Sequence, residues 1–140
     1  FFSLADRDKP AGLDVARRLR RLGFELAATD GTAASLQAAG IPVATTVAKI
    51  GEEHDGRVDA TGLIAAGGVV MVINTPRGRG ARADGAYIRK AATIEGIPVI
   101  TTMSAALAAV LGMADSRAYP MEVRCLQELH DPRLQLDGAS

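Results

Sequence analysis

The sequence predicts a three-layer α/β protein with a parallel, five-stranded sheet, and three observations lead to this prediction. Short apolar runs alternate with amphipathic helical patterns, and the connections between them are short. The run at 69–73, VVMVI, is apolar at every position, as in a strand that is buried on both faces of a parallel sheet. The chain has 140 residues, which is the size of one domain with a real core.

The ends of the first helix are the clearest of the expected boundaries. Asp8 suits its cap and Pro10 its first turn, while Gly23 is typical of a helix end. The expected strands are 1–5, 24–28, 41–45, 69–73 and 99–101, and the expected helices are 10–23, 32–39, 57–66, 83–95 and 104–111.

Three stretches are less regular. Residues 46–56 have the composition of a long loop, a kind of segment that is often functional. Residues 122–130 fit either an edge strand or a short helix, and the alternation of Val123 and Cys125 favours the strand. We therefore expect one domain over 1–130 and a flexible tail over 131–140.

Composition excludes several classes of protein. Sixteen basic and sixteen acidic residues cancel, which argues against broad binding to nucleic acid. One cysteine and two histidines predict neither a disulfide nor a metal site, and Cys125 is expected to be packed and inert. No apolar run is long enough for a membrane span or a signal peptide, which favours a cytoplasmic setting. An opening apolar strand without Met suggests a piece of a longer protein.

The loop at 29–32, TDGT, is the strongest candidate for a binding site. It lies between the second strand and the second helix, where unpaired N–H groups and a partial positive charge attract anions. Gly31 allows close approach, and Thr29 and Thr32 supply hydroxyl groups. Thr29 and Thr32 also suit helix caps, Thr32 in particular, and this role is compatible with the first. We expect this loop to hold a phosphate.

Other strand ends converge on the same edge of a parallel sheet. Lys9 follows the first strand, where it either meets that phosphate or is solvated beside Asp6 and Asp8. Lys49 has the same two interpretations. Asn74 and Thr75 follow the central strand, where they either form a turn or contact a sugar hydroxyl or a base edge. The candidate bordering arginines are Arg77, Arg79 and Arg82, and the candidate acids or bases are His54, Asp55, Asp59 and Asp84.

Five segments together resemble a known family. They are SLADRDK at 3–9, GFELAATDGTA at 23–33, VINTPRG at 72–78, ADGAYIRKAA at 83–92 and LQELH at 126–130. In this order they resemble the methylglyoxal-synthase-like domain at the carboxyl end of the carbamoyl-phosphate synthase large subunit. The resemblance covers about 1–130. It implies a small Rossmann-like fold and a regulatory role without catalytic residues.

The resemblance also implies ligands and partners. The effectors would be UMP and IMP, bound by their phosphate, with ornithine at a neighbouring site. The domain itself would need no cofactor, while the parent ligase would use ATP with Mg or Mn. The parent would contain synthetase domains before this one, pair with a small glutaminase subunit and form oligomers. The implied effector residues are Lys9, Thr29, Thr32, Lys49 and Asn74, then Thr75, Arg79 and Asp84, with Thr101 on the ornithine side.

Two departures from the family accompany the resemblance. Some members have a second threonine at position 76 and a serine at position 85, where this chain has Pro76 and Gly85. Methylglyoxal synthase, the enzyme relative, uses an aspartate in a GPLGGD loop, and 49–59 here reads KIGEEHDGRVD. A phosphate site without its base should bind and not catalyse. A phosphate lyase and a structural or oligomerisation domain with a decayed site are the alternatives.

Overall fold

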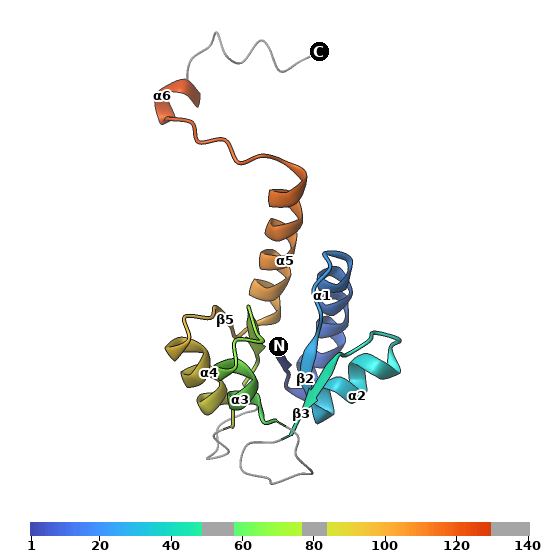
Figure 1. The fold of residues 1–140 in the computed structure, drawn as a ribbon. Coiled ribbons are helices and arrows are strands. Elements are labelled where there is room, and N and C mark those ends of the chain that lie inside the picture. Colours follow the sequence, from blue (N-terminus) through green and yellow to red (C-terminus); the bar gives the residue numbers. More distant parts are fainter. Residues whose placement is uncertain (49–57, 77–83, 130–140) are drawn as a thin grey trace.

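The sheet confirms the predicted fold class. The strands are β1 (Phe2–Ser3), β2 (Ala27–Thr29), β3 (Thr45–Val47), β4 (Val72–Asn74) and β5 (Val99–Ile100). In the computed structural model, which describes residues 1–48, 58–76 and 84–129, they form one sheet in the order β3-β2-β1-β4-β5 (Figure 1). Every neighbouring pair is parallel, so the carboxyl ends of the five strands lie at one edge of the sheet.

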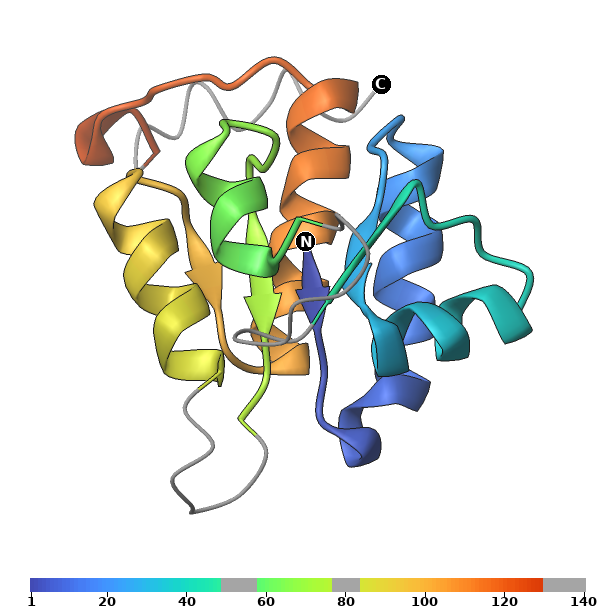
Figure 2. The same ribbon diagram turned by 60° about the horizontal axis from the view of Figure 1, so that its bottom comes forward.

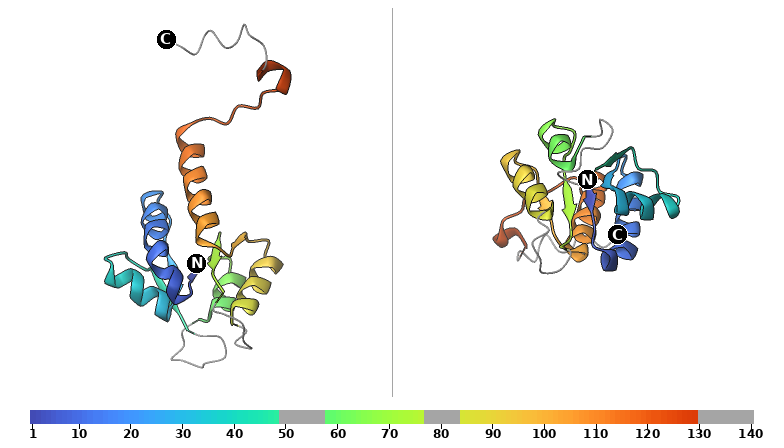
Figure 3. Two further views of the ribbon diagram at one scale, coloured as in Figure 1. Left: turned by 180° about the vertical axis from the view of Figure 1, so that it is seen from behind. Right: turned by 90° about the horizontal axis from the view of Figure 1, so that it is seen from below.

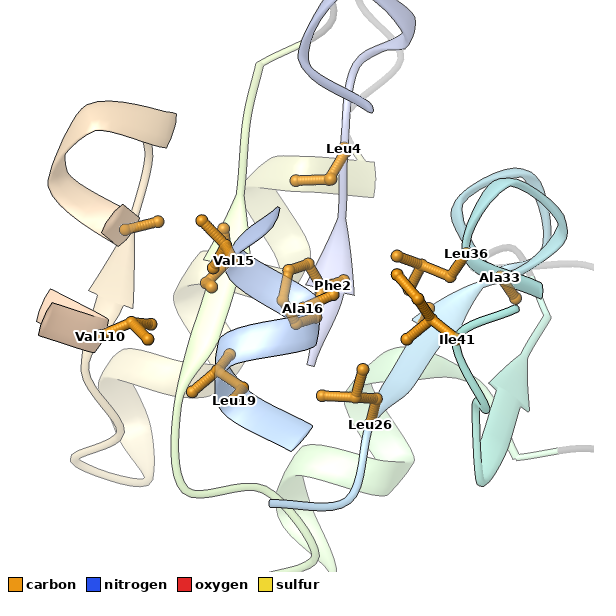
Figure 4. Close-up of a cluster of buried hydrophobic side chains, with 13 residues drawn as sticks. Phe2, Leu4, Val15, Ala16, Leu19, Leu26, Ala33, Leu36, Ile41 and Val110 are labelled. Atoms are coloured by element: carbon orange, nitrogen blue, oxygen red, sulfur yellow. The ribbon is translucent and has the colours of Figure 1, made fainter. Parts of the chain in front are cut away.

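Helices cover both faces of the sheet, which gives the three predicted layers. The helices are η1 (Asp6–Asp8), α1 (Lys9–Arg21), α2 (Asp30–Ala38), α3 (Ala60–Ala65), α4 (Asp84–Ile94), α5 (Met103–Ala118) and α6 (Leu126–Leu129). One apolar cluster, which includes Phe2, Leu19 and Val110, joins the sheet to α1, α2 and α5 (Figure 4). Figure 3, seen from below, shows α3 and α4 grouped together, away from α1 and α2.

The second apolar cluster lies between the sheet and α3 and α4. Alternation along a strand sends successive side chains to opposite faces. Phe2 and Ile73 accordingly belong to the first cluster, and their neighbours Phe1 and Val72 to the second. The strand β4 is thus buried on both faces, as predicted, but only Val72 and Ile73 of the predicted run 69–73 belong to it, and Val70 is 69% exposed.

Three strands begin clearly later than predicted. β4 begins at Val72 and not at 69, and the other two begin late because helix ends use the apolar residues that precede them. β2 begins at Ala27 and not at 24, and β3 begins at Thr45 and not at 41. Gly40 has φ 71° and Ile41 donates its N–H to the Leu36 carbonyl, at 3.0 Å, which closes α2 as a Schellman motif. The Phe24 N–H closes α1 on the Leu19 carbonyl in the same way, also at 3.0 Å.

Several helix boundaries also differ from the prediction, and α2 begins at Asp30 and not at 32. The Asp8 side chain makes no cap hydrogen bond, because Asp8 already has helical angles, φ −96° and ψ −12°, and a cap needs an extended residue. Pro10 does lie in the first turn of α1. α3 begins at Ala60 and not at 57, behind its cap Asp59. α5 runs to Ala118 and not 111, where Arg117 bonds the Leu22 carbonyl and its guanidinium carbon lies 5.4 Å from the centre of the Phe24 ring.

The strand interpretation of 122–130 is wrong for its described part. Residues 119–125 belong to no strand, and 126–129 form the short helix α6, the other alternative. A strand of alternating residues needs a face to bury, but Val123 is 94% exposed. Cys125 is exposed too, so the expectation of a packed thiol is wrong. The predicted tail, 131–140, and His130 lie outside the described residues.

Candidate functional site

The carboxyl ends of the three central strands bring the candidate residues to one edge. β1 lies between β2 and β4, with Phe2 opposite both Ala28 and Ile73. Thr29 ends β2, Asn74 ends β4, and η1 carries the chain from β1 to Lys9 at the start of α1. Figure 2 brings this edge forward, with η1 and the first turn of α2 near each other. Residues far apart in sequence thus frame one polar site.

Lys9 lies at the amino end of α2. A methyl group added at Gly31 would lie 3.6 Å from the Lys9 ammonium, so the ammonium lies over the first turn of that helix. It also pairs with the exposed Asp6 carboxylate at 2.7 Å, while its own side chain is mostly buried. The pairing with Asp6 is thus present as expected, the side chain is less solvated than that interpretation assumed, and the phosphate contact stays a prediction. A cation and a helix amino end at one point favour an anion as the ligand.

The two threonines of the TDGT loop have different positions. Thr29 is the residue before α2 and has extended angles, but its hydroxyl makes no cap bond. It donates instead to the Thr32 hydroxyl oxygen, at 3.2 Å. Thr32 lies inside α2, is fully buried and accepts the Leu4 N–H at 3.0 Å. The predicted capping role of Thr32 is therefore wrong, because this hydroxyl joins α2 to the end of β1.

Asn74 and Thr75 are buried and bonded within the protein. The Thr75 hydroxyl accepts the Ala5 N–H at 2.8 Å, which joins β4 to the chain beyond β1. The Asn74 side-chain oxygen accepts a bond from the Arg89 guanidinium at 2.8 Å. These two bonds fix the positions of the Thr75 and Asn74 side chains. Because Arg89 bonds the Asn74 side-chain oxygen, it also sets the orientation in which Asn74 could meet a ligand.

Arg89 is a residue that sequence reasoning missed. It lies one helical turn after Gly85 on α4, and that spacing was the available signal. A methyl group at position 85 would lie 3.0 Å from the Arg89 guanidinium and 3.1 Å from the Asn74 oxygen. Gly85 therefore leaves the room in which Arg89 reaches Asn74. The glycine that this chain has at position 85, where some family members have serine, therefore has a structural consequence: it makes room for the bond between Arg89 and Asn74.

The remaining candidates are less closely tied to this site. Lys49, Arg77, Arg79, Arg82, His54 and Asp55 lie outside the described residues. Asp84 is the first residue of α4, and only its backbone is described in the structure. Thr101 is exposed and follows β5, at the far side of β4 from Lys9. Its neighbour Thr102 caps α5 by accepting the Ala105 N–H at 3.3 Å.

Asp59 is a helix cap in this structure. Its carboxylate accepts the Gly62 N–H and the Thr61 hydroxyl, each at 2.7 Å. These two bonds lower the pKa of the Asp59 carboxyl, first through Gly62 and then through Thr61. A carboxylate with a lowered pKa is a poor base at neutral pH, since proton transfer favours a pKa near the working pH. Among the acid–base candidates, Asp59 is the one whose side chain lies in the described part of the structure. That side chain has a structural role, as the cap of α3.

The fold and this polar edge define a small α/β domain of the type that binds ligands at its strand ends. A family model described as "MGS-like domain" matches residues 11–101, and the chain belongs to that family. This confirms the family resemblance that the sequence motifs indicated.

Similar proteins include carbamoyl phosphate synthase large chains. The chain is 46% identical, over 95% of its length, to the "Carbamoyl phosphate synthase large chain" of Rubrobacter xylanophilus. It is 45% identical over 91% to that of Rhodopirellula baltica. It is 44% identical over 91% to the "Carbamoyl phosphate synthase large chain, C-terminal section" of Methanopyrus kandleri. The chain spans 12%, 11% and 23% of the length of these relatives.

Proposed function

We propose that this chain is the regulatory, effector-binding domain of a carbamoyl phosphate synthase large chain, and that it binds the phosphate of a nucleotide such as UMP or IMP. The observation that carries the proposal is the Lys9 ammonium over Gly31, at the amino end of α2. The three relatives named above, which share almost the whole chain, supply the context, since each is a carbamoyl phosphate synthase large chain or its C-terminal section.

The magnitudes fit an effector site. A charge-assisted hydrogen bond contributes about 1.5–3 kcal/mol and a helix amino end about 0.3–1 kcal/mol. A micromolar ligand needs about 8 kcal/mol, which further contacts from Asn74 and the proposed Lys49, Arg79 and Asp84 would supply. Allosteric coupling takes only about 1–3 kcal/mol. Because Thr32 and Thr75 join the end of β1 to α2 and β4, an anion at α2 would also act on the central strands.

The wider setting is part of the same proposal. The parent enzyme would be an ATP-dependent ligase that uses Mg or Mn, makes carbamoyl phosphate from glutamine and bicarbonate, and serves pyrimidine and arginine synthesis in the cytoplasm. This domain would contact the preceding synthetase domains, with ornithine near Thr101 and a small glutaminase subunit in the complex. In the described part of the chain, no helix has both the length and the apolar character needed to cross a membrane.

The lyase alternative has less support than effector binding. A phosphate lyase needs a base near the phosphate, and Asp59 uses its carboxylate to cap α3. The structural-domain alternative predicts no ligand at all, so binding separates it from the proposal.

The test is titration calorimetry of the 140-residue chain with UMP, IMP and inorganic phosphate. We expect saturable binding, weakened by about ten-fold or more in Lys9→Ala because one charge-assisted bond is lost. Lys90→Ala is the matched control, since it removes the same charge from an exposed position on α4. Equal affinities for the two variants would refute the assignment of Lys9. Absence of binding for all three ligands would refute the proposed site in this chain.

A further inference from the structure

The side-chain amide of Asn74 has one defined orientation. Its oxygen accepts a bond from the Arg89 guanidinium at 2.8 Å. A guanidinium has only donors, so the amide atom that faces it is the oxygen and not the nitrogen. Asn74 is 2% exposed, and in the interior two facing donors would lose a bond that water does not replace. Arg89 therefore fixes which end of the amide points toward it and which end points away.

The amide nitrogen is the end of Asn74 that remains for a ligand. Among the described residues, no group accepts a bond from this nitrogen, although each buried polar side-chain atom there has a partner. The nitrogen is therefore accessible at the polar edge, where it offers two N–H donors and no acceptor. A ligand group that bonds it must be an acceptor, such as a carbonyl oxygen. An amine would bring a second donor and is disfavoured.

Asn74 lies across β1 from the proposed phosphate position. Thr29 ends β2, Asn74 ends β4, and β1 lies between these two strands. Because neighbouring strands are about 4.8 Å apart, the two strand ends are separated by about 10 Å. A nucleotide whose phosphate lies at the amino end of α2 would extend its sugar and base across β1. The part of such a ligand that reaches Asn74 is the base.

We propose that Arg89 is a positioning residue for base recognition: by fixing the Asn74 amide as a donor, it makes this edge select a base with a carbonyl oxygen over a base with an amine at the same position. The inference rests on the proposed nucleotide binding and deepens it. Uracil and hypoxanthine have a carbonyl where cytosine and adenine have an amine, so UMP and IMP fit this rule and CMP and AMP do not. Arg89 acts through Asn74 and needs no contact with the ligand.

Gly85 is the second residue on which this selection depends. A methyl group at position 85 would lie 3.0 Å from the Arg89 guanidinium nitrogen and 3.1 Å from the Asn74 oxygen. Both distances are shorter than ordinary van der Waals contact, so one of the two bonded groups would have to shift. Gly85 leaves the space that the bond needs, and Arg89 supplies the donor.

Nucleotide selectivity tests the role of Arg89. Titration calorimetry would compare UMP with CMP, and IMP with AMP. We expect the unaltered chain to prefer the carbonyl nucleotide of each pair by about ten-fold or more, since a donor left without an acceptor is costly. Arg89→Met lets the amide turn over, so the preference should fall to within about three-fold. Arg89→Lys keeps a donor and should restore most of the preference.

The control is Lys90→Met, which removes an exposed cation from the neighbouring position of α4 and should leave the preference unchanged. If nucleotides bind and Arg89→Met keeps the full preference, the inference is overturned and the proposed function stands. If Arg89→Met weakens inorganic phosphate as strongly as UMP, Arg89 is an anion contact and the inference is again overturned. Absence of binding for all four nucleotides would refute the proposed function, and this inference with it.

A second variant keeps the test decisive if Arg89→Met does not fold. Gly85→Ala should fold, because alanine favours a helix over glycine, and it should reduce the preference by displacing Arg89 from Asn74. Gly112→Ala is the matched control: it makes the same change on α5, where an added methyl group meets no atom within 4 Å. Equal preferences in these two variants would overturn the inference, whereas a loss confined to Gly85→Ala would support it.

Discussion

The two ends of this sheet differ in the chemistry of the groups that line them. At the carboxyl end, polar groups gather and satisfy one another: hydroxyls accept N–H groups of the chain after β1, and Arg89 bonds Asn74. At the amino end, an apolar groove surrounds an amine at Phe1. The carboxyl end is a polar edge whose side chains are held in place by bonds within the protein. The amino end is lined almost wholly by apolar side chains. The difference teaches that one sheet can carry two surfaces of opposite chemistry, and that polar groups at the strand ends need partners that apolar groups do not.

The largest predicted effect concerns the Phe1 amine. The unfolded chain binds a proton there below pH 8.0, whereas the folded chain binds it only below about pH 5. Between these values the unfolded state holds more protons, so stability should fall as pH is lowered from 8 to 5 and level off below 5. At about 1.4 kcal/mol per pH unit, the loss reaches about 4 kcal/mol.

Acetylation of Phe1 provides the control, because an amide does not titrate. Urea unfolding at several pH values should show this loss in the free chain and not in the acetylated chain. Carboxylates and histidines contribute equally to both profiles, so the difference between them isolates the amine. Identical profiles would mean that the amino end tolerates a charge, and the contrast between the two ends would disappear.

The next effect tests the carboxyl end. Thr75→Val keeps the shape of the side chain but removes the acceptor of the buried Ala5 N–H. Leaving a buried donor without its acceptor costs about 1–3 kcal/mol, which urea unfolding would measure. Thr93→Val is the matched control: the exposed Thr93 hydroxyl donates only to the Arg89 carbonyl of its own helix, and its loss should stay within about 0.5 kcal/mol. Equal losses would show that the threonine–backbone bonds do not hold this end.

The sequence predicted the fold class better than the boundaries of its elements. Alternating apolar runs and helical patterns were enough for a parallel five-stranded sheet. The starts of β2 and β3 were wrong because Phe24 and Ile41 are apolar for a different reason: each closes a helix behind a glycine. Apolar character alone cannot distinguish a strand residue from the residue that seals a helix end, although the preceding glycine is a usable signal.

The candidate site, too, was predicted from the sequence only in part. Placement of Lys9 and the TDGT loop at one edge follows from parallel strands, and the sequence predicted it. The partners of buried hydroxyls do not follow from any pattern, because they depend on contacts between distant segments: Thr32 with Leu4, and Thr75 with Ala5. Arg89 was missed for the same reason, since an arginine on a helix is ordinarily solvated and only the space at Gly85 brings it to Asn74.

The smallest predicted effect sharpens the account of the anion site. Asp6 holds the Lys9 ammonium at 2.7 Å, so an incoming phosphate must compete with a carboxylate. Asp6→Asn removes that competitor, and phosphate should then bind more tightly, by no more than about five-fold because exposed ion pairs are weak. Calorimetry at low ionic strength would measure the change, with Asp14→Asn as the control, since Asp14 pairs with Arg18 elsewhere on α1. Weaker binding in Asp6→Asn would mean that Asp6 orients Lys9 toward the anion. The ion pair would then be part of the binding site, and the carboxyl end would be preorganised by its charged groups as well as by its buried hydroxyls.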